Sequence, residues 1–212
     1  MDVTEAATST STTTRPRGRP RSEAARQAIL EATRVLLEAT TVRDLTIETI
    51  ARQAGVSKST IYRWWPNKAA IVIDAVETIV PRTRLAASKS VSAALTEQLL
   101  LLVEHYRGPY GRIVKELIAE GQTDPDVLSA FRDRFLLRRR TVARDLIEHG
   151  KSTGEFDAAL NTDLACDIIY GPVYYRLLVA HLPLDDEFSR ALPKQILVAL
   201  HHPGIYGASA HP

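Results

Sequence analysis

The chain has 212 residues, of which 45% are hydrophobic and 25% charged, and its formal net charge is +2. This length and composition are typical of a globular protein of one large or two small domains with a buried core. Apolar runs stay well short of the ~20 residues of a membrane span, and the polar N-terminal stretch lacks the apolar region of a secretory signal. The single Cys166 cannot form an internal disulfide, which fits a reducing compartment. We therefore expect a soluble protein of the cytoplasm with no membrane partner.

Positive charge is concentrated towards the N-terminus. Between Arg15 and Lys68 the chain carries eleven Lys and Arg against five Asp and Glu, so the remainder is net acidic. A basic N-terminal part, here called the basic front, followed by an acidic remainder is typical of a protein in which one end binds a polyanion. An unevenly charged, solvated surface is the alternative interpretation.

The basic front begins with residues 1–21, which lack a core-forming pattern and are expected to be a disordered arm. The segment RPRGRPR (15–21) places a positive charge at every second position, and its prolines and glycine disfavour a helix. Its Arg-Gly-Arg-Pro core resembles the AT-hook, which binds the minor groove of DNA, so Arg17 and Arg19 are candidate contacts. A plain basic tail is the alternative.

The residues that follow have the apolar spacing and the capping residues of helices. Ser22 is placed to cap a first helix, Thr46 a second, Ser57 a third and Asn67 a fourth. Gly55 is placed to end the second helix, at a position that favours a positive φ.

Helical patterns continue to the end of the chain. Further helices are expected at about 91–106, 110–121, 125–149, 162–181 and 186–201. We expect Gly150 to end the long helix before it, and Pro193 to kink or delay the last helix. Because no segment shows the sustained alternation of a strand, the predicted fold class is all-α.

Two of the expected helices are short and are joined through AGVS (54–57), which makes a helix-turn-helix unit. At 100° per residue, Ile61 and Trp65 share one face of the second helix, which we expect to be buried. Ser59 and Arg63 lie nearly opposite. Small hydroxyls and an Arg on that outer face can approach base edges in a major groove.

The ends of these helices are suited to phosphates. Ser57 and Lys58 place backbone N–H groups and a cation at a helix N-terminus, and Lys68 repeats the arrangement at the next helix. Trp64 is expected at the edge of the unit, where its indole N–H can reach a phosphate.

The stretch TIETIARQAGVSKSTIYRWWPNKAAIV (46–72) closely resembles the DNA-binding region of the TetR/AcrR family of bacterial transcriptional regulators. DPDVLSAFRDRFLLRRR (124–140) is similar to a C-terminal subgroup of that family. The resemblance implies a homodimer of about nine helices per chain, with a helix-turn-helix domain at 22–67, a ligand-binding and dimerisation domain at 68–205 and a tail at 206–212. It also implies repression through double-stranded DNA and release by a small ligand. The two-fold symmetry of a dimer predicts a palindromic operator.

The resemblance also assigns DNA contacts. Phosphate contacts are implied for Thr46, Ser57, Tyr62, Trp64 and Lys68. Base contacts are implied for Lys58, Ser59, Thr60 and Arg63.

A pocket for a small, largely apolar effector is expected between the helices from about Val91 to His149, whose apolar interior contains scattered polar groups. The candidate pocket residues are His105, Tyr106, Tyr110, Phe131 and Phe135. Ordinary core packing is the alternative for them. Because no catalytic, metal-binding or cofactor motif is found, we expect no metal, no cofactor and no enzyme activity.

Two other classes of function stay open at this point. An architectural DNA-binding protein would also use a basic arm, but it would have weak sequence preference. An enzyme with catalytic residues spread over several helices would leave the basic front unexplained. The leading expectation is a dimeric, ligand-responsive repressor.

Overall fold

The computed structural model describes residues 19–78 and 90–201, with side chains described from residue 23 onwards. Every regular element in these ranges is a helix, so the all-α prediction is confirmed. The first helices are α1 (Arg19–Ala39), α2 (Ile47–Ala54), α3 (Lys58–Tyr62) and α4 (Lys68–Glu77). The later ones are α5 (Val91–Arg107), α6 (Pro109–Gly121), α7 (Pro125–Ala130), the π-helical η1 (Phe131–Leu136), α8 (Leu137–Thr153), α9 (Thr162–Val179) and α10 (Asp186–His201). Because α7, η1 and α8 run on without a break, the described part holds nine helices.

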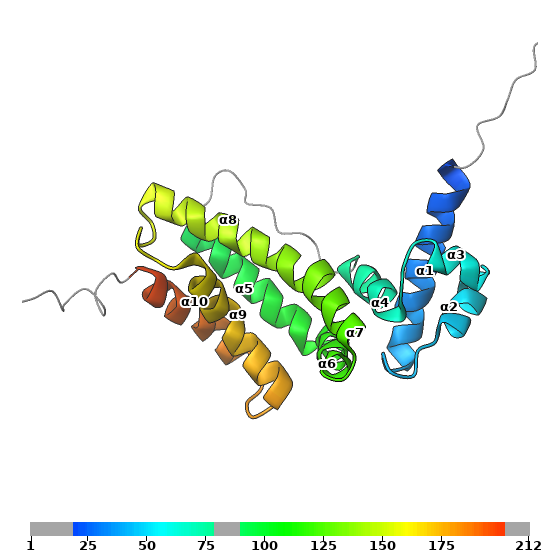
Figure 1. Cartoon of the computed structure of the whole chain (residues 1–212). Helices are drawn as coiled ribbons and strands as arrows, with labels where there is room; N and C mark the ends of the chain where they lie inside the picture. Colours follow the sequence, from blue (N-terminus) through cyan, green and yellow to red (C-terminus); the bar gives the residue numbers. More distant parts are fainter. Residues whose placement is uncertain (1–18, 79–89, 202–212) are drawn as a thin grey trace, which may run out of the picture.

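The helices form two parts (Figure 1). A head of α1, α2 and α3 lies at one end, and a core domain of α5 to α10 lies at the other, with α4 between them. Helix α4 packs against α1 on the head and against α7 and η1 on the core domain. Seven of its ten residues are buried, as expected of a helix that is apolar all round. A displacement of α4 would therefore change the packing of both the head and the core domain.

The predicted caps of α2, α3 and α4 are confirmed. Thr46 and Thr49 form a reciprocal capping box at the start of α2, and Gly55 ends that helix with φ of 65°. Ser57 Oγ accepts the Thr60 N–H at 3.3 Å, and Asn67 Oδ1 accepts a backbone N–H at the start of α4. Local chemistry thus fixes both ends of the helix-turn-helix unit.

The start of α1 differs from the prediction. The helix begins at Arg19 rather than after Ser22, so Arg19 is helical and not part of an extended arm. Pro20 is tolerated there because the first turn of a helix needs no N–H from it. Arg17, the tail at 206–212 and most of the arm lie outside the described residues.

One prediction about the core domain was also wrong. The long helix passes Gly150 and ends at Thr153, where Gly154 takes φ of 76°. Gly150 is needed for packing instead, because a Cβ on it would overlap the ring of Phe156. The last helix begins at Asp186, as expected, and continues through the buried Pro193, so Pro193 does not delay it.

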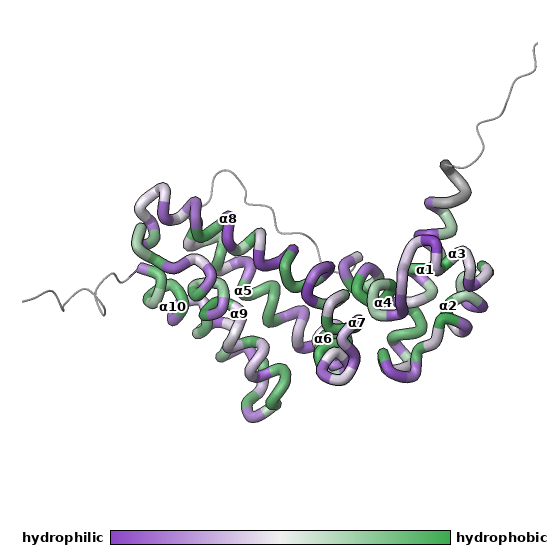
Figure 2. The backbone as a smooth tube through the Cα atoms, in the orientation of Figure 1, coloured by the Kyte–Doolittle hydropathy of each residue, from purple (hydrophilic) through white to green (hydrophobic). Residues whose placement is uncertain are grey.

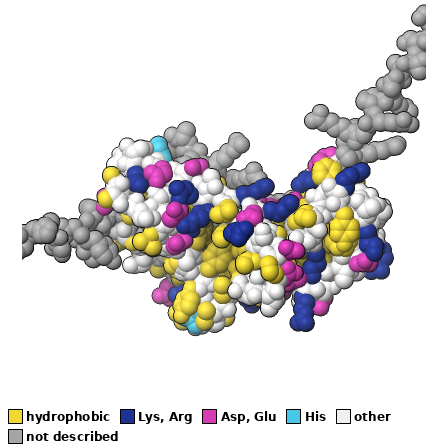
Figure 3. Space-filling model, viewed as in Figure 1, with side chains coloured by type: hydrophobic (Ala, Val, Ile, Leu, Met, Phe, Trp, Pro, Cys, Tyr) yellow, Lys and Arg dark blue, Asp and Glu magenta, His cyan; other side chains and the backbone are white. Residues whose placement is uncertain are grey.

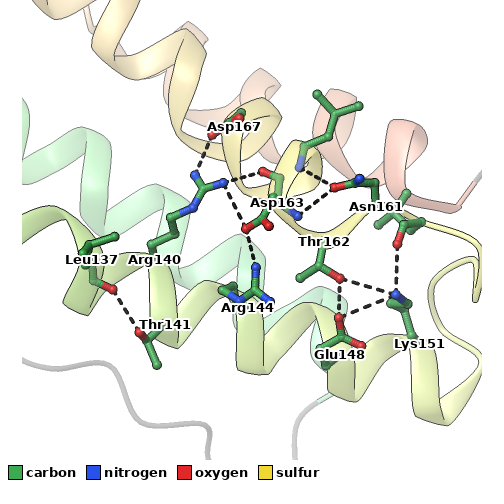
Figure 4. A network of polar contacts seen from close by, with 12 residues as sticks. Leu137, Arg140, Thr141, Arg144, Glu148, Lys151, Asn161, Thr162, Asp163 and Asp167 are labelled. Atoms are coloured by element: carbon green, nitrogen blue, oxygen red, sulfur yellow. Dashed lines mark hydrogen bonds and ion pairs between the residues drawn. The ribbon is translucent and has the colours of Figure 1, made fainter. Parts of the chain in front are cut away.

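An ion-pair network fixes α9 along α8 (Figure 4). Arg140 donates to Asp167 at 2.5 Å and to the carbonyl of Asp163 at 2.8 Å, while Arg144 pairs with the Asp163 carboxylate. Asn161 caps α9, as predicted, by accepting two backbone N–H groups. Each exposed pair contributes little alone, but the network holds α9 in a defined register on α8.

Among the described residues, none of the helices combines the length and the hydropathy that crossing a bilayer demands.

Candidate nucleic-acid interface

Helix α3 has the two faces that its sequence predicts. Ile61 and Trp65 are buried and anchor the helix to the head. Tyr62, by contrast, is 55% exposed. The outward side also carries exposed polar side chains from α3 and its flanks, namely Thr46, Ser57, Lys58, Ser59 and Arg63. Thr60 is half-buried.

Three hydroxyls gather at the start of α3. Ser57 Oγ lies 2.8 Å from Ser59 Oγ and 2.9 Å from Thr60 Oγ1. Hydroxyl protons can rotate to donate or accept. The hydrogen bonds among these three hydroxyls can therefore be replaced by hydrogen bonds to base edges or phosphates.

Lys58 is paired with an acid that sequence reasoning did not single out. Its Nζ donates to Glu48 Oε1 of α2 at 2.7 Å, and both side chains are exposed. The hydrogen bond raises the pKa of Lys58 and lowers the pKa of Glu48. A contact between Lys58 and DNA would therefore compete with Glu48 or bring this carboxylate close to the DNA.

Trp64 does not present its indole N–H to the outside. The ring is half-buried, and Nε1 is covered and has no hydrogen-bond partner among the described residues. The Arg26 guanidinium lies 6.0 Å from the Trp64 ring centre and 5.8 Å from that of Trp65. The ring packs inward beside Arg26, so this geometry does not favour the phosphate contact expected of Trp64, which stays a prediction.

Lys68 is also engaged inside the molecule. Its Nζ donates to the carbonyls of Val42 at 2.6 Å and Arg43 at 3.2 Å, and lies 3.5 Å from Glu120. These partners turn the ammonium group towards the α1–α2 loop and α6. The phosphate contact expected of Lys68 stays a prediction, and this geometry does not favour it, because the ammonium group is bonded within the chain.

The recognition segment is tied to α4 through one carboxylate. Trp65 Nε1 donates to Asp74 Oδ2 at 2.8 Å. Asp74 also lies 3.8 Å from a guanidinium nitrogen of Arg26 in α1 and 3.6 Å from one of Arg134 in η1. Three elements thus meet at Asp74, one of them in the core domain.

A second tie, which we call the head–core joint, uses Arg112, Glu116 and Glu120, spaced four residues apart on α6. Arg112 donates to the carbonyl of Leu37 at 2.5 Å, near the end of α1. Glu116 accepts the Val42 N–H at 2.8 Å. Glu120 pairs with Lys68, as described above. One face of α6 therefore holds the α1–α2 loop of the head.

The exposed cations of the head extend beyond the predicted set. Arg43 and Arg52 are exposed. Arg43 precedes the helix-turn-helix unit in the sequence and Arg52 lies in its first helix, a signal that was available without the structure. Lys and Arg side chains gather at the outer end of the head, over α2 and α3 (Figure 3). Such cations suit an electrostatic contact with a phosphate backbone.

The predicted pocket residues fall into two places. His105 and Tyr110 line a cavity of about 470 Å³. Phe131 and Phe135 stack at 5.0 Å in the core domain, where both are buried. Tyr106 is buried too, and its hydroxyl donates to that of Tyr174 at 3.0 Å. Tyr110 borders both places, with its ring 5.4 Å from that of Tyr106.

The core interior contains polar groups without partners. The Tyr110 hydroxyl, Gln98 Oε1 and Arg139 Nε are all buried and make no hydrogen bond within the described part of the chain. Burial raises the pKa of Tyr110, which keeps the phenol neutral. Arg139 pairs with Glu77 at 3.5 Å and lies 4.4 Å from the Phe135 ring centre. Unpaired buried polar groups often mark a place for water or a ligand.

Comparisons with known proteins agree with this geometry. Residues 29–75 match the family described as bacterial regulatory proteins, tetR family, and residues 85–196 match the tetracyclin repressor-like C-terminal domain. The chain belongs to the TetR family of transcriptional regulators. It is therefore a helix-turn-helix DNA-binding protein of a family whose members are not enzymes.

Individual relatives cover most of this TetR-family chain. YdeS, an uncharacterized HTH-type transcriptional regulator of Bacillus subtilis (strain 168), is 37% identical over 177 residues, which is 83% of this chain and 89% of the relative. The crystal structure of the TetR family transcription regulator SCO0332 is 34% identical, with a TM-score of 0.71, and covers 84% of this chain and 99% of the other. RolR in complex with resorcinol shares the fold at 19% identity and a TM-score of 0.59, over 85% of this chain and 89% of the other.

Proposed function

We propose that this TetR-family regulator is a cytoplasmic repressor that binds a palindromic operator as a homodimer and is released by a small, largely apolar molecule. The observation that carries the proposal is the exposed face of α3. Its hydroxyls and cations point away from the anchors Ile61 and Trp65. A face of this kind fits a major groove.

The DNA contacts divide between bases and phosphates. We propose base contacts for Lys58, Ser59, Thr60 and Arg63. We propose phosphate contacts for Thr46, Ser57 and Tyr62. Arg43 and Arg52 join them as cations that strengthen binding to any sequence. Trp64 and Lys68 act from behind this face, by positioning the head.

The homodimer proposal is supported by an uncovered apolar face on α9. Leu164, Ile168, Tyr175 and Val179 are exposed at spacings of four, seven and four residues, which places them along one side of the helix. Val198 of the adjoining α10 is exposed as well. The end of α9 and the turn after it are hydrophobic (Figure 2). A second copy, related by two-fold symmetry, would cover this face with the same residues.

Release by a ligand is supported by the connections of α4 and α6. A molecule that changes the core domain acts on η1 and α4, and through Asp74 on Trp65. Coupling free energies of ~1–3 kcal/mol, or roughly 5–150-fold in affinity, are usual for such switches. RolR, a protein of the same fold, binds resorcinol, which supports a small molecule as the effector class.

Selection of genomic DNA fragments by the purified full chain tests the proposal. We expect a palindromic sequence that is bound ~10³-fold or more tightly than unrelated DNA at the same salt concentration. Nearly equal binding to all fragments would instead favour an architectural DNA-binding protein. An operator beside the protein's own gene would also identify the regulated genes.

A further inference from the structure

The cavity of about 470 Å³ lies between the head and the core domain, and we call it the joint cavity. The head contributes Leu37 and Glu38 of α1, and α4 contributes Val76. The core domain contributes His105 of α5 and Ile113 of α6, with Gly108 in the turn between them. A volume in this range suits a small organic molecule.

The charged groups around the joint cavity already have partners. Glu38 accepts from Arg34 at 2.6 Å, and Glu104 accepts from Arg107 at 3.3 Å. A charged ligand would have to break one of these pairs or remain unpaired at an apolar surface, which is costly. The lining therefore favours an uncharged molecule.

One polar group remains available to orient such a molecule. His105 Nδ1 is bonded to the carbonyl of Leu101 at 2.5 Å, while Nε2 has no hydrogen-bond partner among the described residues. The remaining lining is mostly aliphatic, with the Tyr110 ring at one side. Because the Leu101 carbonyl can only accept, Nδ1 carries the proton and Nε2 of the neutral ring is an acceptor. This chemistry fits an apolar ligand that carries a single hydroxyl or N–H group.

Gly108 lines the joint cavity and has no side chain to occupy it, so a substitution at this position can be used to fill the cavity. Its φ of −98° is ordinary for any residue. A Cβ at this position would meet nothing closer than the His105 carbonyl oxygen, at 3.9 Å. A larger side chain at position 108 can therefore enter the cavity without strain in the backbone.

The cavity adjoins the head–core joint. Leu37 lines the cavity with its side chain, and its carbonyl accepts the bond from Arg112. Ile113 of α6, next to Arg112 in the sequence, contributes to the wall on the core-domain side. A molecule that contacts both walls therefore acts on the spacing between α1 and α6, and so on the position of the head.

We propose that the joint cavity is a ligand site for a small, uncharged, apolar molecule, separate from the aromatic interior around Phe135, and that its occupation weakens DNA binding by moving α1 relative to α6. The second half of this inference rests on the proposed function, because it needs an operator whose half-sites fix the distance between two heads. The first half, binding at the cavity, does not.

The test uses the full chain and N-phenyl-1-naphthylamine, a neutral apolar dye that brightens on transfer to an apolar site. We expect saturable binding in the unchanged protein and an affinity lowered by roughly tenfold or more in Gly108→Phe, whose ring fills the site. Ala119→Phe is the matched control, since Ala119 is exposed on α6 and does not line the cavity. It should leave the affinity unchanged.

Two further variants keep the result decisive. Glu104 is an exposed residue at the rim of the cavity, so Glu104→Trp should fold even if Gly108→Phe does not. The indole ring should obstruct the cavity and lower the affinity for the dye. Phe135→Leu alters the interior and should have little effect. No saturable binding, an unchanged affinity in both Gly108→Phe and Glu104→Trp, or a loss confined to Phe135→Leu would each overturn the proposal.

Operator DNA then tests the coupling. Saturating operator should weaken dye binding by roughly 5–150-fold, because coupling between two sites is reciprocal. Equal dye affinity with and without bound operator would overturn the regulatory half. Failure to find any palindromic operator would instead count against the proposed function, while the dye measurement on the variants would still decide whether the cavity binds ligands.

Discussion

Trp65 donates its indole N–H to Asp74 at 2.8 Å, and this bond joins the end of the recognition segment to the middle of α4. The same carboxylate faces Arg26 of α1 and Arg134 of η1. The orientation of α3 is therefore set by contacts that reach the core domain. A π-helical segment such as η1 is rare and frequently lies at a functional site, and here it supplies the contact from the core side.

Replacing Asp74 should show that this bond stabilises the head. Asp74→Leu leaves the Trp65 N–H buried without a partner, and we expect the free energy of unfolding to fall by about 1–3 kcal/mol. Asp74→Asn keeps an oxygen for the indole and should cost less. Urea denaturation followed by tryptophan fluorescence measures both. In a double-variant cycle with Trp65→Phe, additivity within ~0.5 kcal/mol would contradict a direct interaction.

Lys68→Ala should act on stability rather than on the salt dependence of DNA binding. The ammonium group is bonded to two loop carbonyls and lies near Glu120, so its loss should lower the unfolding free energy by roughly 1–3 kcal/mol. Arg52→Ala is the control, because that side chain is an exposed cation beside the proposed DNA face. It should leave stability nearly unchanged and reduce the slope of log affinity against log salt by about one. The reverse pattern would restore Lys68 as the phosphate contact.

Glu48→Gln should strengthen binding to DNA of any sequence by a few-fold, roughly the effect of one removed surface charge at moderate salt. The substitution removes a negative charge beside the proposed interface and frees Lys58. Because the bond from Lys58 lowers the pKa of Glu48, the carboxylate stays ionised across neutral pH. The gain measured by fluorescence anisotropy should therefore be the same at pH 6.5 and 8. A gain that disappears at the lower pH would mean that Glu48 is already protonated there.

Substitutions on the outer face of α3 should separate base contacts from phosphate contacts. Ser59→Ala should relax preference at one base pair of each half-site, by about 1–3 kcal/mol. Tyr62→Phe should weaken binding to all sequences alike, since a phosphate carries no sequence information. Competition with operators altered at single positions measures both. Identical behaviour of the two variants would show that the contacts are assigned wrongly.

A charge on the apolar face of α9 should prevent dimer formation. We expect Tyr175→Glu to be monomeric by analytical ultracentrifugation with unchanged helical circular dichroism, because Tyr175 is exposed in the single chain. Arg190→Glu, a charge change on the exposed surface of α10, is the comparison that should remain dimeric. A Tyr175→Glu protein that still dimerises would place the interface elsewhere.

The sequence predicts those parts of the fold that depend on neighbouring residues. The caps at Thr46, Ser57 and Asn67 each bind a backbone N–H three residues on, and Gly55 needs only a positive φ. The burial of Trp65 follows from helical spacing. Such features involve a few successive residues, so they can be read without knowing the fold.

Other features depend on residues far away in the chain. The Lys68 side chain turns inward because its ammonium group contacts Glu120 and two loop carbonyls. Position 150 requires glycine because the ring of Phe156 leaves no room for a Cβ there. The Trp64 ring lies inward beside Arg26, more than thirty residues earlier in the chain. The composition of residues 131–136 gives no indication of a π-helix. In each case tertiary packing decides what a local pattern leaves open.

In the proposed complex, two copies of α3 read two equivalent half-sites. Footprinting of the purified protein on its selected DNA fragment shows whether they do. We expect two inverted half-sites with centres about one helical turn apart, roughly 34–36 Å, or an overlapping pair of such sites. Protection of a single, non-repeated half-site by the full chain would contradict the account.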